Sequence, residues 1–187
     1  MSTKYILHGG FDKNKEYIRD EFFQEVLRDT PDTPADVKIF LVFFAEPKEY
    51  LQLRIEQCKG QFNNNKGLKN LEFKMAFEEN FLEGCAWADV IFLSGGRTVN
   101  LIESLKKFQN LRQILKDKII AGDSAGVNVL GRFFYSRKTK EISEGFGILP
   151  FKIVVHYEDG APNPLADIEP KLETLFLHEY ETKVISY

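Results

Sequence analysis

The stretch KIIAGDSAGVNVLG, residues 118–131, changes character at its centre. Its first residues form an apolar run of the kind found in buried strands, and the residues after Ser124 read as the start of a helix. A strand that passes through a glycine–serine–glycine turn directly into a helix is a recurring unit of α/β proteins. The stretch therefore predicts a strand, a sharp turn at Ser124 and a helix.

The rest of the chain repeats this alternation. Apolar runs that predict strands lie at 4–10, 37–45, 71–77, 89–96, 151–157 and 183–187. Segments that predict helices lie at 13–29, 48–62, 98–108 and 164–180, with shorter ones at 79–88 and 111–117. Strands separated by helices pair in parallel through right-handed crossovers. Because no repeat or linker interrupts the pattern, we expect one domain over residues 1–187, an α/β fold with a mostly parallel sheet and helices on both faces.

Composition narrows the class of protein. The chain has 187 residues, 43% of them hydrophobic and 28% charged, as ordinary globular proteins do. Its net charge of −3 argues against a nucleic-acid surface, and the basic cluster at 135–140 reads as a solvated loop. No signal-peptide pattern and no apolar stretch of about 18 residues is present, so we expect a cytoplasmic protein without a membrane partner. Cys58 and Cys85 have no metal-ligand spacing and are expected to be packing thiols.

Ser124 is the candidate nucleophile. GDSAG matches the G-x-S-x-G pattern in which a serine stands on a strained strand-to-helix turn, with its hydroxyl exposed at the sheet edge. The alternative is a turn of small residues in which Ser124 caps the helix. Asp123 beside it is predicted to be a solvated turn residue, the alternative being a carboxylate that selects cationic substrates.

A nucleophilic serine needs a base and an oxyanion site. His156 ends a predicted strand and therefore belongs at the same sheet edge as Ser124, with His8 as the competing base. His178 is predicted to lie in a helix facing solvent. For the oxyanion, the backbone N–H groups of Ala125 and Gly96 are the candidates, although the Gly95–Gly96 pair is equally consistent with a simple turn or a phosphate site.

Three blocks of the chain, in this order, resemble peptidase family S51, which includes aspartyl dipeptidase (peptidase E) and cyanophycinase. The blocks are ADVIFLSGGRTVNLIESLK (88–106), IIAGDSAGVNVL (119–130) and GFGILPFKIVVHYED (145–159). The resemblance implies a three-layer, flavodoxin-like sandwich related to class I glutamine amidotransferase domains. It implies Ser124 as nucleophile, His156 as general base, and N–H groups near Gly96 and Ala125 for the oxyanion. It also implies hydrolysis through an acyl-serine, with no metal or organic cofactor.

The sequence departs from the family pattern at two functional positions. The family's dipeptidase has a triad aspartate about fifteen residues after the serine, and here that region holds no aspartate. Glu141 is the nearest acid and becomes the weak candidate, with Glu144 next. The arginine that the dipeptidase uses to read an N-terminal aspartate has no counterpart, only Lys171 nearby, so specificity for that residue is not carried over. With 31 residues after His156, the C-terminal end is expected to be short for the family.

These observations favour a serine hydrolase acting on small peptides or related amides. The alternative from another class is a catalytically silent member that binds a small ligand at the same edge, and it predicts no acid partner for His156. An esterase of the α/β-hydrolase type is disfavoured, because that fold orders its triad serine, acid, histidine. A homodimer is one assembly that the sequence leaves open.

Overall fold

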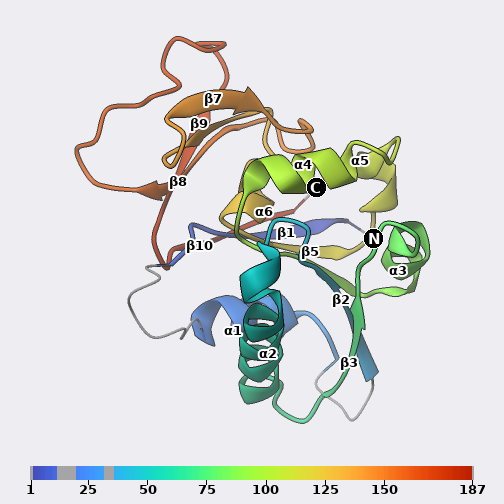
Figure 1. Ribbon diagram of the computed structural model, residues 1–187. Helices are drawn as coiled ribbons and strands as arrows, with labels where there is room; N and C mark the ends of the chain where they lie inside the picture. The colour runs from blue at the N-terminus through green and yellow to red at the C-terminus, as the bar shows by residue number, and fades with distance from the viewer. Residues whose placement is uncertain (1, 12–19, 32–35, 187) are drawn as a thin grey trace.

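The computed structural model describes residues 2–11, 20–31 and 36–186, and a six-stranded sheet lies at its centre (Figure 1). The strands run in the order β10-β1-β5-β4-β2-β3. Their bounds are β1 Lys4–His8, β2 Asp36–Val42, β3 Asn70–Met75, β4 Val90–Leu93, β5 Ile119–Asp123 and β10 Thr182–Ser186. Every pairing among β1 to β5 is parallel, and β10 is antiparallel to β1 at one edge. The predicted mostly parallel sheet is confirmed.

Helices cover both faces of this sheet (Figure 1). Their bounds are α1 Asp20–Arg28, α2 Lys48–Asn64, α3 Phe81–Trp87, α4 Thr98–Leu105, α5 Leu111–Ile114 and α6 Ala125–Asn128. α1 and α2 pack on the face that carries Ile6, Ile39 and Phe92. The other helices pack on the opposite face, with Leu7 and Ile91. Because successive strand residues point to opposite faces, the near-continuous apolar runs supply both cores at once, as expected for a buried parallel sheet.

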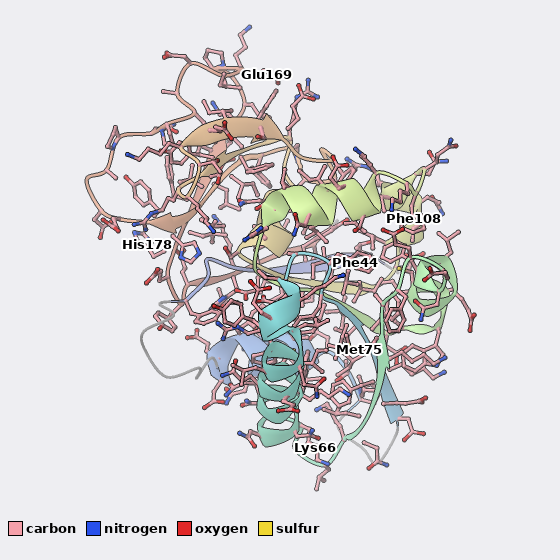
Figure 2. All side chains as sticks on the ribbon, in the orientation of Figure 1. Phe44, Lys66, Met75, Phe108, Glu169 and His178 are labelled. Carbon is pink, nitrogen blue, oxygen red and sulfur yellow. The ribbon has the colours of Figure 1, made fainter. Side chains whose placement is uncertain are left out.

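Aromatic side chains fill both layers. On one face the ring of Phe23 lies 4.7 Å from that of Phe62, edge to face. On the other face Phe81 stacks on Phe108 at 4.4 Å and approaches Phe44 at 6.0 Å, the last two being labelled in Figure 2. Such contacts add to the free energy gained by burying large apolar surfaces. This dense packing fixes the strands whose ends carry the candidate site.

A second, four-stranded sheet lies beside α4 and α6 (Figure 1). Its order is β7-β6-β8-β9, with β6 Phe133–Ser136, β7 Glu141–Glu144, β8 Lys152–Tyr157 and β9 Thr174–His178. The β6–β7 hairpin was not predicted as strand; only its turn matches the expected solvated loop. Through Phe134, Ile153 and Leu177 this sheet joins the core on the α4 side of the main sheet.

The helix predicted at 164–180 is wrong. Residues up to Glu173 form turns, and the following residues form β9. The physical reason is Lys152, whose buried ammonium donates hydrogen bonds to the backbone carbonyls of Leu165 and Ile168 at 2.9 and 2.8 Å. A buried charge without partners would be costly, so the chain turns these carbonyls toward Lys152, and the Ile168 N–H donates to the Leu165 carbonyl in a turn. The long-range hydrogen bonds of Lys152 therefore outweigh the local helical preference of this segment.

The start of the predicted helix at 13–29 falls at 12–19, outside the described residues, and α1 occupies the remainder. The other predicted helices and strands appear at their expected places with ends shifted by a few residues. Within the described ranges, no helix combines the length and the apolar character needed to cross a membrane.

Both cysteines are buried, and burial raises the pKa of the Cys85 thiol to about 12 against a smaller lowering by Lys118. The thiolate is the reactive form, so we expect iodoacetamide at pH 8 to leave the native protein unmodified. Intact-mass measurement after an hour of treatment checks this, and the same treatment in urea should add two groups. Alkylation of Cys85 in the folded protein at the rate of a free thiol would contradict it.

Candidate active site

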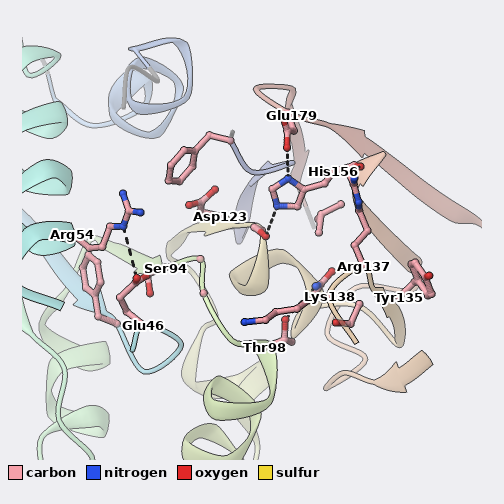
Figure 3. Close-up of a pocket in the computed structure, with 18 of the residues that line it drawn as sticks. Glu46, Arg54, Ser94, Thr98, Asp123, Tyr135, Arg137, Lys138, His156 and Glu179 are labelled. Atoms are coloured by element: carbon pink, nitrogen blue, oxygen red, sulfur yellow. Dashed lines mark hydrogen bonds and ion pairs between the residues drawn. The ribbon is translucent and has the colours of Figure 1, made fainter. Parts of the chain in front are cut away.

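The candidate site lies where the carboxyl ends of β1, β4 and β5 meet the second sheet. A cavity of about 400 Å³ opens there (Figure 3). Its lining includes Ser124 after β5, His156 near the end of β8, and Glu179 just after β9. Ligand sites in open α/β sheets form at this edge, because side chains at the strand ends converge while the loops stay free of the core.

Ser124 stands on the sharp turn that the sequence predicts. Its backbone angles, φ 44° and ψ −97°, are sparsely populated for a residue with a Cβ atom. The turn is held by the Ser124 N–H, which donates to the carbonyl of His8, and by close approach at Gly126, where a Cβ would lie 2.2 Å from the Leu93 carbonyl oxygen. Strand and helix can meet this closely only with glycine there, and the strained serine is thereby presented to the cavity.

A row of three side chains runs through the site (Figure 3). Ser124 Oγ lies 3.0 Å from Nε2 of His156. On the other side of the ring, His156 Nδ1 lies 2.9 Å from Oε1 of Glu179. All three are partly shielded: the His156 and Glu179 side chains are 25% and 35% exposed. Serine, imidazole and carboxylate in this order and at these distances have the arrangement of a catalytic triad.

The acid is one that the sequence did not indicate. Glu141 and Glu144 lie on β7, exposed, and neither lines the cavity. Glu179 lies in the turn between β9 and β10, where Tyr180 adopts φ 65° and its N–H donates to the Gly10 carbonyl. Because the sequence predicts a helix over 164–180, the turn that carries Glu179 was not predicted. The signal that could have exposed it is the short apolar run TLFL before His178, which suits a strand.

His8, the competing base, is placed elsewhere. Its ring is 1% exposed, packs 4.8 Å from that of Phe22 and brings Nδ1 to 2.8 Å from Oδ1 of Asp123. His8 does not line the cavity. Asp123 is 3% exposed, so the expectation that it is solvated is wrong. A carboxylate in this apolar setting requires a partner, and the imidazole of His8 supplies one.

The two oxyanion candidates lie on opposite sides of the serine turn. Ala125 is the first residue of α6, where backbone N–H groups have no partner within the helix. Gly96 lines the cavity with φ 134°, and a Cβ on it would fall 2.4 Å from the Ala45 carbonyl oxygen. Glycine is therefore required at 96, and its backbone borders the space beside Ser124.

Charged side chains around the cavity are largely paired. Arg54 Nε lies 3.7 Å from Glu46 Oε1, and Arg137 Nη2 lies 2.9 Å from Glu158 Oε1. Lys138 extends into the cavity toward Thr98 (Figure 3). A search of the described part of the chain finds no group of three His, Cys, Asp or Glu side chains able to hold a metal ion.

His178 ends β9 rather than lying in a helix, and it is partly exposed as expected. Its Nδ1 lies 2.9 Å from Glu181 Oε2 and its Nε2 lies 3.0 Å from Asp159 Oδ1. Both contacts raise the pKa of His178, and the hydrogen bond with Glu181 has the larger effect. For Glu181, burial raises the pKa, but hydrogen bonds from the backbone and ring of His178 outweigh it, so the pKa is lowered. The cluster fastens the turn that carries Glu179.

The His178 cluster predicts a pH-dependent stability. A raised histidine pKa contributes stability that is complete below the unfolded value of about 6.5 and is lost as pH rises through the folded pKa. The lowered pKa of Glu181 contributes stability at pH values above about 4.3. We therefore expect His178→Gln to lower the free energy of unfolding more at pH 5.5 than at pH 8.5. Urea unfolding at both values checks this, with Asp159→Asn as the companion variant, and equal losses at both would contradict it.

Two solved structures with the same α/β fold are described as peptidases. A peptidase from an acI-B1 Actinobacterium is 21% identical, with a TM-score of 0.68 over all of this chain and 84% of its own. A peptidase E-like protein from Listeria monocytogenes EGD-e is 15% identical, with a TM-score of 0.64 over all of this chain and 98% of its own. At these identities the likeness shows the fold. Comparison with curated proteins gave no match.

The family follows from the sequence. Residues 13–183 match the model of peptidase family S51, and the chain belongs to that family. The predicted membership and the flavodoxin-like architecture are confirmed. Membership supports a peptidase-like function.

Proposed function

We propose that this protein is a serine hydrolase that cleaves short peptides, dipeptides foremost, or related amides through an acyl-serine intermediate. Ser124 is the nucleophile, His156 the general base and Glu179 the acid that orients the imidazole. The observation that carries the proposal is the unbroken row from Ser124 Oγ to His156 Nε2, 3.0 Å, and from His156 Nδ1 to Glu179, 2.9 Å. The presence of Glu179 also favours a hydrolase over a catalytically silent binding protein, because the silent alternative predicts that His156 has no acid partner.

In the first step, the Ser124 hydroxyl donates its proton to His156 Nε2 while Oγ attacks the carbonyl carbon of the scissile amide. The imidazolium holds its second N–H toward the Glu179 carboxylate, which stabilises the positive charge and fixes the tautomer. The negative charge that develops on the carbonyl oxygen is assigned to the backbone N–H groups of Ala125 and Gly96. His156 then returns the proton to the leaving amine.

The second step releases the acyl group. A water molecule takes the place of the leaving amine, gives a proton to His156 Nε2 and attacks the ester carbon of acyl-Ser124. The oxyanion donors act again, and the proton passes back to Ser124 Oγ as the ester bond breaks. No group outside this chain and water is needed for either step.

The cavity favours small substrates. Its volume of about 400 Å³ lies at the lower end of the range for small-molecule sites. The hairpin turn that carries Arg137 and Lys138 borders it on one side, and α2 with Arg54 on the other. A dipeptide fits such a space.

A fluorophosphonate probe tests the proposal directly. The wild-type protein should gain one adduct by intact mass, His156→Ala should lose labelling at matched times, and a dipeptide library should reveal at least one cleaved substrate. Circular dichroism of each sample ensures that the fold is retained. Absence of both labelling and cleavage in folded wild-type protein would overturn the assignment.

A further inference from the structure

The backbone of His156 is held in an unusual conformation. His156 has φ 53°, in the left-handed region that residues with a Cβ atom seldom occupy. It interrupts the pairing of β8 with β9, where the register shifts between Val155 and Tyr157. Such a bulge re-aims one side chain of a strand. Here it is the imidazole that lies against Ser124, so whatever holds the bulge also sets the serine–imidazole distance.

Two hydrogen bonds hold the bulge from opposite ends of the residue. The His156 N–H donates to the Gly9 carbonyl at 3.0 Å. Arg137 Nη1 donates to the His156 carbonyl at 2.7 Å, and its Nη2 lies 2.9 Å from Glu158 Oε1 (Figure 3). The ring itself lies over Gly10, where a Cβ would fall 2.3 Å from His156 Nε2. Gly9, which accepts the first hydrogen bond, directly follows β1 of the main sheet. Of these two hydrogen bonds, the second is the one that a side chain donates.

Arg137 is built into a turn that fixes its direction. It follows Ser136 in the β6–β7 hairpin, where the Lys140 N–H donates to the Ser136 carbonyl at 2.7 Å and the Thr139 N–H donates to Ser136 Oγ at 3.3 Å. The Arg137 side chain is 50% exposed and belongs to no apolar cluster. Its removal therefore withdraws the donor from the His156 carbonyl without opening a cavity in the core.

We propose that Arg137 is a positioning residue, which holds the left-handed bulge at His156 and thereby keeps Nε2 within hydrogen-bond reach of Ser124 Oγ. The inference rests on the proposed function for its catalytic consequence. Arg137 acts through the backbone of His156, so its loss should lower the rate of acylation more than the affinity for substrate, although Arg137 also lines the cavity. A displacement of about 1 Å at a reacting group costs about 10²-fold in rate.

The test compares Arg137→Met and Arg137→Lys with Arg132→Met, a matched loss of an exposed arginine paired to Glu169 outside the cavity. We expect Arg137→Met to lower kcat and the fluorophosphonate labelling rate about 10²-fold, with a smaller effect on KM. Arg137→Lys keeps a donor and should recover part of the loss. Arg132→Met should behave as wild type. Unchanged rates in Arg137→Met, or a change confined to KM, would overturn the proposal.

A second measurement does not depend on activity. In ¹⁵N-histidine-labelled protein, the His156 ring signals, assigned by their loss in His156→Gln, should move in Arg137→Met and stay in Arg132→Met. Unmoved signals would overturn the positioning role. If the signals move in Arg137→Met but the wild-type protein neither takes the label nor cleaves a dipeptide, the positioning role stands and the proposed hydrolase function is overturned. Thermal unfolding of each variant separates these outcomes from loss of the fold.

Discussion

Replacing Ser124 by alanine is expected to abolish fluorophosphonate labelling and to lower kcat for a cleaved dipeptide by about 10⁴-fold or more, because the Ser124 hydroxyl is the one that lies against the proposed base, His156. Alanine keeps the Cβ atom and the backbone strain of the turn, where φ is 44°, so the melting temperature should change little. Steady-state kinetics and intact mass measure the two effects.

The control for this variant is Ser143→Ala. Ser143 lies on β7 and does not line the cavity. It should label at a rate within a few-fold of wild type. An adduct that persists on the Ser124→Ala protein would show that another residue is the nucleophile, and peptide mapping of that adduct would identify it.

Replacing Glu179 by glutamine is expected to lower kcat by about 10³- to 10⁴-fold, with a smaller effect on KM. The amide keeps the size of the side chain but removes the charge that stabilises the imidazolium, and it can hold the ring in the wrong tautomer.

Glu141→Gln is the matched control, because Glu141 is the acid nearest to the place of the family's triad aspartate and it lies exposed on β7. That variant should retain wild-type kinetics. The opposite pattern, with loss in Glu141→Gln and full activity in Glu179→Gln, would return the role to the position indicated by the sequence.

The fold and two of the three residues of the triad row could be predicted from local sequence. Buried parallel strands are near-continuous apolar runs, and the glycines around Ser124 mark a turn that other residues cannot make. His156 could be placed because it ends such a run, and strand ends in this class of fold share one edge. These are properties of short segments, visible without knowing what packs against them.

Glu179 and Asp123 depended on distant parts of the chain. The segment before Glu179 has helical spacing, but its carbonyls serve the buried ammonium of Lys152, so the local preference loses to a tertiary one. Asp123 reads as a polar turn residue, and its burial is favoured by His8, which lies on the neighbouring strand with a nitrogen 2.8 Å away. Residue spacing along the chain predicts neither the contact of Glu179 with His156 nor the contact of Asp123 with His8.

The pairing of β1 has a consequence for the order in which the molecule assembles. β1 lies between β5 and β10, and its register with β10 joins Lys4 to Ser186. Contacts between residues so far apart form late, because closing long loops costs entropy before the contacts stabilise anything. Glu179 lies between β9 and β10. We expect the pairing of β9 with β8, which brings Glu179 beside His156, to form before the pairing of β10 with β1, because far fewer residues separate β8 from β9.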